Sequence, residues 1–264
     1  MGQQSVSYPI NVKNINVSFG SINALKNISL CMERGRFYGI LGPNGSGKTT
    51  LLKSIAKNLK PQRGAVFING ADIGKMKAKE LSKELAYMYQ STDTQCDYSV
   101  TDVVLMGRNP YLRRFQTEGS MDREIAMKAM KATNIWQLKD RRINEISGGE
   151  RQRAFVARAL VQDTDIVLLD EPVSHLDLQH QIEVLDIARK MARKQRTVVA
   201  VLHDLNLAST YCDCLILLKE GAVIAQGEPE KVLTEEIIEE VYGIKPYIVR
   251  GVNNNRPYII PFKK

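Results

Sequence analysis

The feature that most constrains this chain is an eight-residue stretch, Gly42-Pro43-Asn44-Gly45-Ser46-Gly47-Lys48-Thr49. It fits the pattern G-x-x-x-x-G-K-[ST], in which glycines let backbone N–H groups surround phosphate oxygens without a Cβ in the way. An apolar run, 37–41, precedes the stretch, and Leu or Ile at positions 51, 52, 55 and 59 follows it at helical spacing. The sequence therefore predicts a strand, a phosphate-binding loop and a helix whose N-terminus favours anions.

Two side chains of this loop have predicted roles. Lys48 would reach the β- and γ-phosphates of a nucleotide as a catalytic cation, and the Thr49 hydroxyl would bind Mg²⁺. The whole loop is expected to hold the nucleotide through Gly42, Pro43, Asn44, Gly45, Ser46, Gly47, Lys48, Thr49 and Thr50. The loop does not reveal what the nucleotide is used for, because kinases, GTPases, motors and transporters all carry it.

A second pattern narrows the classes of nucleotide-binding protein to which the chain could belong. The apolar run 166–169 ends in two adjacent carboxylates, Asp170 and Glu171. In P-loop ATPases the acid that ends this strand holds Mg²⁺, which predicts Asp170 as a metal ligand. Glu171 is then well placed to act as the general base on the attacking water.

The chain alternates short β-rich runs with helical patterns, which favours a mostly parallel sheet covered by helices. Buried strands are predicted at 37–41, 165–169, 197–202 and 215–218. An antiparallel layer is predicted from 12–19 and 65–70. Between about 91 and 162, Met121, Ile125 and Ala129 recur at helical spacing, which indicates a helical insertion.

Charge is the unusual part of the composition. Among 264 residues, 37 Lys and Arg stand against 29 Asp and Glu, a net charge of +8, so an anionic partner is expected. Nucleic acid, a phosphate-bearing ligand and an anionic membrane face all remain open on this ground. No apolar run approaches the roughly 18 residues of a membrane-spanning helix, and no secretory signal is evident. The four cysteines are scattered, so we interpret Cys212 and Cys214 as incidental buried thiols in a reducing compartment.

The stretch Ile146-Ser147-Gly148-Gly149-Glu150 resembles LSGGQ, the signature motif of ABC (ATP-binding cassette) ATPases, with Ile146 and Glu150 as departures. The second departure is acceptable on physical grounds, because Ser147 and Glu150 have the spacing of a capping box, in which Glu and Gln are interchangeable. The capped helix is expected to run from Glu150 to Val161 with its N-terminal N–H groups free for phosphate.

Other cassette motifs follow in the order that the resemblance implies. Gln90 resembles the Q-loop residue that contacts Mg²⁺ and water. Ser174-His175-Leu176-Asp177 resembles the D-loop, where His175 is a departure and Asp177 is expected near nucleotide. His203 resembles the switch histidine that pairs with the γ-phosphate, and Phe19 stands where the family stacks an aromatic ring on adenine.

The resemblance implies a P-loop NTPase of RecA-like α/β fold with an antiparallel β layer and an inserted helical subdomain. One ABC ATPase domain would span 1–264, with an α/β core at 1–90 and 163–264 and a helical subdomain at 91–162. In this family the signature of one subunit closes over the nucleotide of another. The expected catalytic unit is therefore a homodimer that sandwiches two Mg-ATP, with Ser147, Gly148, Gly149 and Glu150 contacting nucleotide.

Within the family, the chain is most similar to ATPases of importers for iron-siderophore, haem or cobalamin. The similarity lies in 107–111, 178–182, 201–206 and 241–243. It implies a membrane permease as partner, an extracytoplasmic binding protein acting through it, and a position at the cytoplasmic face of the membrane. An importer of another metal ion and an exporter remain alternatives. A soluble ATPase acting on nucleic acid is a further, weaker one, so no nucleic-acid partner is expected. If residues 91–112 receive the permease, charge reversal near Arg108 should uncouple transport from hydrolysis.

Overall fold

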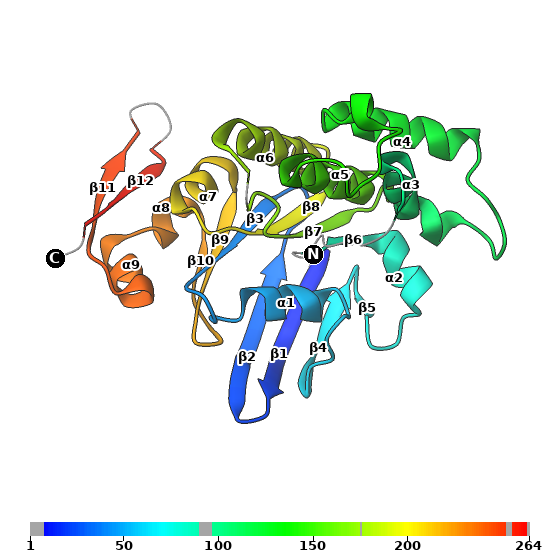
Figure 1. Ribbon diagram of the computed structural model, residues 1–264. Helices are drawn as coiled ribbons and strands as arrows, with labels where there is room; N and C mark the ends of the chain where they lie inside the picture. Colours follow the sequence, from blue (N-terminus) through cyan, green and yellow to red (C-terminus); the bar gives the residue numbers. More distant parts are fainter. Residues whose placement is uncertain (1–7, 90–96, 175, 252–254, 263–264) are drawn as a thin grey trace, which may run out of the picture.

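The computed structural model describes residues 8–89, 97–174, 176–251 and 255–262. A six-stranded sheet forms its centre, in the order β10-β9-β3-β8-β7-β6 (Figure 1). All neighbours pair in parallel except β10, which is antiparallel to β9. The strands are β3 (Phe37–Leu41), β6 (Leu85–Met88), β7 (Ile166–Asp170), β8 (Thr197–Val201), β9 (Cys214–Lys219) and β10 (Ala222–Gly227). The four predicted buried strands are thus confirmed to within one residue at each end.

The predicted antiparallel layer is also present, as a second sheet in the order β2-β1-β4-β5. Its strands are β1 (Ile10–Phe19), β2 (Ile22–Met32), β4 (Arg63–Ile68) and β5 (Ala71–Asp72). Apolar residues of this layer and of helix α1 (Lys48–Ile55) pack against one face of the six-stranded sheet in a single buried cluster. Every residue of β3, β7 and β8 is buried because both faces of the central sheet are covered.

Helices cover the other face of the central sheet. The second buried cluster includes apolar residues of α3 (Val100–Leu105), α4 (Ser120–Ala132), α5 (Gly148–Val161), α6 (Leu178–Arg193) and α7 (Leu205–Tyr211). The α/β architecture with an antiparallel layer and inserted helices is thus the one that the sequence predicted. The helix predicted to begin at Glu150 begins two residues earlier, at Gly148.

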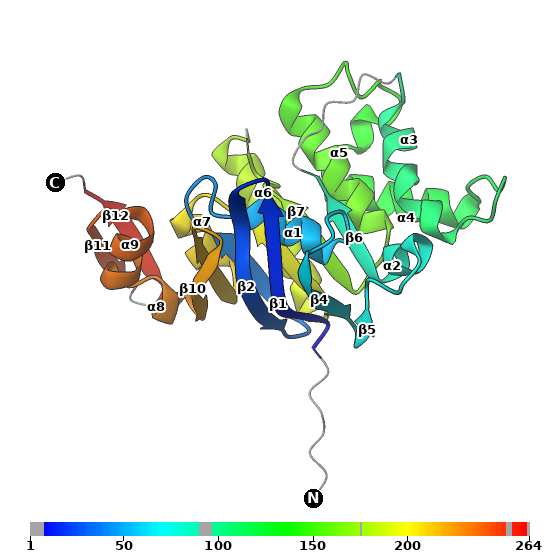
Figure 2. The same cartoon turned by 90° about the horizontal axis from the view of Figure 1, so that it is seen from below.

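The helical insertion projects from one end of the molecule (Figure 2). It contains α3, the 3₁₀ segment η1 (Met106–Tyr111), α4, the 3₁₀ segment η2 (Trp136–Leu138) and α5. The predicted helical spacing of Met121, Ile125 and Ala129 corresponds to α4, where Ala129 is buried and Met121 is exposed. The boundaries of a separate subdomain at 91 and 162 stay a prediction.

Arg108 is buried rather than on an open surface, so charge reversal at this position is a poor test of the expected uncoupling, which stays a prediction. Its side chain is buried between α4 and α5: Nε donates to Asp122 Oδ1 at 2.8 Å, and a guanidinium N–H donates to the Val161 carbonyl at 2.9 Å. The guanidinium carbon also lies 4.1 Å from the centroid of the Tyr111 ring. A glutamate here would face Asp122 in a buried site and leave it unpaired, so it would destabilise the helical insertion by about 3–5 kcal/mol rather than report on coupling.

The remaining elements lie at the two ends of the molecule. Helix α2 (Ala78–Glu84) precedes β6 near the helical insertion, whereas α8 (Pro229–Val232), α9 (Glu235–Tyr242) and the hairpin β11 (Pro246–Arg250) and β12 (Pro257–Pro261) lie at the opposite end (Figure 2). Cys212 and Cys214 are buried and free, and burial raises the pKa of Cys214 to about 11. In the described ranges, no helix has both the length and the apolar character to cross a membrane.

Candidate functional site

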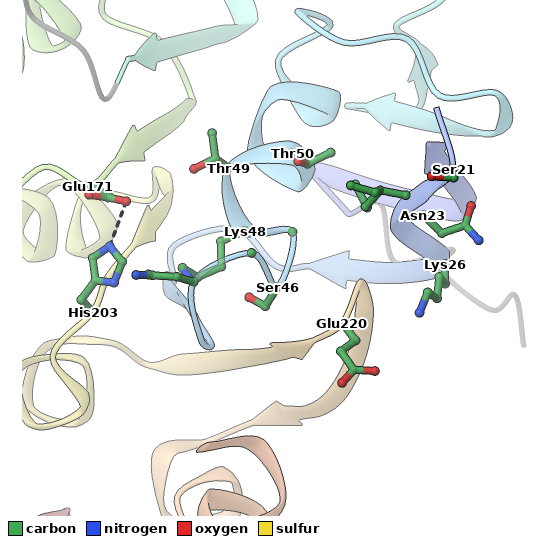
Figure 3. Close-up of a pocket in the computed structure, with 15 residues that line it drawn as sticks. Ser21, Asn23, Lys26, Ser46, Lys48, Thr49, Thr50, Glu171, His203 and Glu220 are labelled. Carbon is green, nitrogen blue, oxygen red and sulfur yellow. Dashed lines mark ion pairs between the residues drawn. The ribbon is translucent and has the colours of Figure 1, made fainter. Parts of the chain in front are cut away.

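A cavity of about 900 Å³ is lined by about half of the predicted site residues (Figure 3). It lies where β3, β7 and β8 end, because the loop after β3, Glu171 after β7 and His203 after β8 all border it. Carboxyl ends of parallel strands are the usual ligand sites of open α/β sheets. The predicted residues that line it are Asn44, Gly45, Ser46, Gly47, Lys48, Thr49, Thr50, Glu171 and His203.

The phosphate-binding loop requires glycine at two described positions. Gly42 has φ +145°, and a Cβ there would lie 2.1 Å from the Leu218 carbonyl oxygen. Gly47 has φ +101°, and a Cβ there would lie 2.5 Å from the Ala24 carbonyl oxygen. The loop therefore packs directly on the backbone of β9 and β2 before α1 begins at Lys48.

Lys48 is held inside this loop by the loop's own backbone. Its Nζ donates to the carbonyl oxygens of Gly42 at 2.8 Å and Pro43 at 2.9 Å. Burial lowers the pKa of Lys48, and the nearby carboxylates Glu171 and Asp170 oppose that shift. Ser46 Oγ, also buried, has no hydrogen-bond partner among the described residues. An unpaired buried hydroxyl and a buried cation beside N–H groups fit the phosphates of a nucleotide.

Asp170 lies beside the loop with hydroxyl groups on both carboxylate oxygens. It is fully buried, and it accepts from Thr49 Oγ1 and from the Tyr87 hydroxyl, each at 3.0 Å. Burial raises the pKa of Asp170, while the hydrogen bonds from Tyr87 and Thr49 lower it. A carboxylate and a threonine hydroxyl in contact are the hard oxygen donors that Mg²⁺ prefers, so this pair fits the predicted metal site. Tyr87, at the penultimate position of β6, was not foreseen from the sequence.

Glu171 and His203 are in direct contact at one wall of the cavity. The distance from Glu171 Oε1 to His203 Nε2 is 2.8 Å, and Figure 3 shows the two side chains pointing toward each other beside Lys48. The Glu171 side chain is 15% exposed and that of His203 is 47% exposed. Glu171 has φ +52°, a left-handed conformation that costs a non-glycine residue about 1–3 kcal/mol. Such strain persists only where surrounding contacts enforce it.

The contacts that enforce the left-handed conformation of Glu171 are hydrogen bonds to its carbonyl oxygen. Ser174 donates to this oxygen through Oγ at 2.9 Å and through its backbone N at 3.3 Å. Gln152, buried on α5, donates to the same oxygen through Nε2 at 3.1 Å. The helix that begins at the signature stretch is therefore bonded directly to the backbone of the proposed base. Sequence reasoning missed Gln152 because nothing in its local pattern distinguishes it from a core polar residue.

We expect Gln152→Leu to lower kcat for ATP hydrolysis by about 2- to 12-fold with little change in KM, since one neutral hydrogen bond contributes about 0.5–1.5 kcal/mol. Steady-state rates over a range of ATP concentrations measure both constants. Gln137→Leu is the matched control, because the Gln137 amide donates to the Asn134 carbonyl on the surface of the helical insertion. Equal loss in both variants, or a change in KM alone, would contradict the positioning role.

The residues of the predicted signature motif lie outside the cavity. Ser147 caps α5: its Oγ accepts from the Glu150 backbone N at 3.3 Å, and Glu150 Oε2 accepts from the Ser147 backbone N at 2.8 Å, so the predicted capping box is present. Gly148 is exposed, and a Cβ there would meet nothing within 4 Å. Asp177 is exposed and caps α6 by accepting from the His180 backbone N at 2.9 Å. None of Ser147, Gly148, Gly149, Glu150 and Asp177 lines the cavity of its own chain.

Phe19 also does not line the cavity. It is half-exposed and pairs across the β1–β2 turn with Ile22, and Ile22 forms part of the cavity wall instead. Adenine stacking on Phe19 therefore stays a prediction, as does the role of Gln90, which lies outside the described residues, like His175.

The end of the cavity away from Lys48 has a wall that the sequence did not reveal. It comes from the β1–β2 turn and the β9–β10 turn, which meet where the Lys26 backbone N donates to the Gly221 carbonyl at 2.8 Å. The cavity residues from these turns are Ser21, Ile22, Asn23, Ala24, Lys26 and Glu220. The two turns are about 200 positions apart, so no local signal could have joined them.

Comparison with known sequences gives one consistent result. A family model described as ABC transporter matches residues 25–174. The chain is 37% identical over 250 residues to the ferric enterobactin transport ATP-binding protein FepC of Escherichia coli K12, covering 94% of this chain and 92% of that protein. It is 33% identical over 254 residues to the iron(3+)-hydroxamate import ATP-binding protein FhuC of Bacillus subtilis 168, covering 96% and 94%.

Solved structures agree. A chain from an ABC transporter in an inward-facing conformation, described as of the metal-chelate type, has a TM-score of 0.84 and 26% identity over 97% of this chain and 98% of that one. The dimeric cassette MJ0796, in a post-hydrolysis state bound to ADP and Pi, has a TM-score of 0.74 and 29% identity over 83% and 98%.

Proposed function

This chain belongs to the ABC transporter family as one of its ATPases, and we propose that it drives import of a ferric siderophore or a related metal chelate through a membrane permease. The observation that carries the proposal is similarity over almost the full length to ATP-binding proteins whose names state ferric enterobactin and iron(3+)-hydroxamate transport. The cavity and its residues support the ATP-hydrolysing step.

In this proposal the residues around Lys48 bind and orient the triphosphate. Lys48 Nζ exchanges its contacts with the Gly42 and Pro43 carbonyls for phosphate oxygens, and the N–H groups of the loop bind the same charge. Mg²⁺, when bound through Thr49 and Asp170, would neutralise the negative charge that develops on the phosphates.

Glu171 acts as the general base. A water oxygen forms a bond to the γ-phosphorus, the bond from that phosphorus to the oxygen bridging to the β-phosphate breaks, and the water proton passes to the Glu171 carboxylate. The products are ADP and inorganic phosphate. His203, at 2.8 Å, restrains the carboxylate and can donate to the γ-phosphate once nucleotide is present.

The catalytic unit in this proposal is a homodimer. The signature residues Ser147 to Glu150 and Asp177 are absent from the cavity of their own chain, and the exposed start of α5 offers free N–H groups. A second copy can supply them across a two-fold axis, so that two nucleotides are sandwiched between two chains. The permease and, through it, an extracytoplasmic binding protein complete the assembly at the cytoplasmic face of the membrane.

The test is uptake in cells that depend on this chain. With the chain and its permease present, radiolabelled ferric siderophore should accumulate, and the permease should co-purify with the chain in detergent. The Glu171→Gln variant should abolish uptake while co-purification persists. Uptake of cobalamin or haem in place of ferric siderophore would change the substrate within the proposed class. Co-purification of nucleic acid without any membrane protein would overturn the proposed function.

A further inference from the structure

The positive charge of the chain is concentrated in its first third. Residues 1–89 contain thirteen Lys and Arg and only four Asp and Glu, so this segment alone exceeds the net charge of +8. ATP binding requires one of those cations, Lys48. The other Lys and Arg residues of this segment need another explanation.

Nine exposed cations from this segment and from the loop after η1 form one basic surface. Two backbone contacts join its parts: Lys57 Nζ donates to the Met76 carbonyl, and Lys79 Nζ donates to the Leu112 carbonyl. Lys83 Nζ also lies 6.0 Å from the centroid of the Tyr111 ring. These contacts connect the end of α1, helix α2 and the loop after η1. Helix α2 and the helical insertion lie at the same end of the molecule in both views, and α1 lies nearer its centre (Figures 1 and 2). The basic surface consists of Lys53, Lys57, Lys60, Lys75, Lys77, Lys79, Lys83, Arg113 and Arg114.

Acidic residues do not cancel this charge. The same segments contain four, and three of them accept local hydrogen bonds: Asp72 from the Gly74 backbone N, Glu80 from the Lys77 backbone N and Glu84 from Asn69 Nδ2. The fourth is Glu118. Nine cations against four acids leave a strong positive potential, unlike the last hundred residues, where acids predominate.

One large apolar side chain stands at the edge of the basic surface. Phe115 is 92% exposed, the largest exposed fraction among the exposed large hydrophobic side chains of the described residues. Its φ of +66° belongs to the left-handed region, and the Arg114 guanidinium carbon lies 5.1 Å from the centroid of its ring. The chain thus presents an aromatic ring on a tight turn, next to two arginines, with no apolar partner from the described fold.

We propose that the basic surface and Phe115 bind the headgroup region of an anionic phospholipid bilayer. Lysines and arginines spread over a surface bind anionic headgroups without specific geometry, and an exposed aromatic ring between cations enters the interface at the same depth. The inference rests on the proposed function only for its setting, since a permease subunit would hold this chain beside a membrane. The lipid contact would then fix the orientation of the chain on that permease.

Vesicle sedimentation tests the lipid contact without the permease. The full-length chain is mixed with vesicles of phosphatidylcholine alone or with about one-third phosphatidylglycerol, at low and at high salt. We expect binding to the anionic vesicles only, and release by high salt because surface charges are screened. In a variant with Lys75, Lys77, Arg113 and Arg114 changed to Gln, the partition coefficient should fall about fivefold for each charge removed. Phe115→Ser should weaken binding to the anionic vesicles at low salt, because the aromatic ring no longer enters the interface.

The matched control changes four exposed cations elsewhere to Gln: Lys190, Lys194, Lys245 and Arg250. It alters the net charge equally and should bind vesicles as the unaltered chain does. Equal loss in both quadruple variants, or no binding to anionic vesicles, would overturn the proposal. The proposal would also be overturned if the surface variant bound vesicles normally but failed to co-purify with the permease in detergent. The basic surface would then bind protein rather than lipid. ATP hydrolysis by the free chain should be the same in all these variants, so failure of the lipid contact is separate from failure of the proposed ATPase role.

Discussion

Glu171→Gln is expected to lower the rate of ATP hydrolysis by about 10²- to 10⁴-fold, the contribution that a positioned general base makes. The amide is nearly isosteric with the carboxylate, but it cannot accept the proton of the attacking water. ATP binding should persist, because Lys48 and the loop backbone remain. An ATP-bound dimer should therefore accumulate, visible as a doubled mass in size-exclusion chromatography with light scattering.

Glu220→Gln provides the matched control for this prediction. Glu220 lines the same cavity at the end away from Lys48, so the substitution makes the same chemical change in the same cavity. It should leave the rate of hydrolysis within a few-fold of normal and should not trap a dimer. Hydrolysis by Glu171→Gln at the normal rate would exclude Glu171 as the base, and equal losses in both variants would indicate a general electrostatic effect.

Lys48→Met should weaken nucleotide binding without unfolding the protein. The ammonium is expected to contribute about 1.5–3 kcal/mol through charge-assisted hydrogen bonds to phosphate, so the Kd for ATP should rise about 10- to 100-fold. Burial lowers the pKa of Lys48, which shows that its charge is disfavoured in the nucleotide-free fold. Removing that charge offsets the loss of its two bonds to the Gly42 and Pro43 carbonyls, so stability without nucleotide should change little.

Thermal unfolding with and without ATP separates these two effects. In the unaltered chain, ATP at 100 times its Kd should add about 2.7 kcal/mol to the free energy of unfolding, and the Met variant should lose most of this gain. Lys26→Met is the control, since Lys26 lines the same cavity but lies away from the loop. A Lys48 variant that unfolds at a much lower temperature without nucleotide would mean that the two carbonyl contacts are structural.

The central sheet was predictable because strands buried on both faces form continuous apolar runs. Residues 37–41 and 197–201 are apolar almost throughout, and both became interior strands. The capping box of Ser147 and Glu150 was equally readable, because its hydrogen bonds join residues three apart. Local chemistry of this kind fixed the start of α5 to within two residues.

What the sequence could not reveal depends on contacts between distant segments. Gln152 reaches the Glu171 carbonyl across 19 positions, and Tyr87 reaches Asp170 across 83, so neither appears in a local pattern. Arg108 lies in the stretch 107–111 that resembles importer ATPases, and nothing in that stretch reveals that pairing with Asp122 buries it. Exposure is a property of the packed chain, which a motif does not contain.

The shared carbonyl of Glu171 has a consequence for how chains of this kind can diverge. The side chains of Gln152 and Ser174 donate to one acceptor, so each is expected to tolerate replacement better while the other still bonds that oxygen. Losing one side-chain donor leaves the other beside the Ser174 backbone N–H, whereas losing both leaves the strained backbone restrained by that N–H alone. During divergence, the residues at positions 152 and 174 are therefore expected to change together or in a restricted order. This holds although neither residue has to contact the nucleotide.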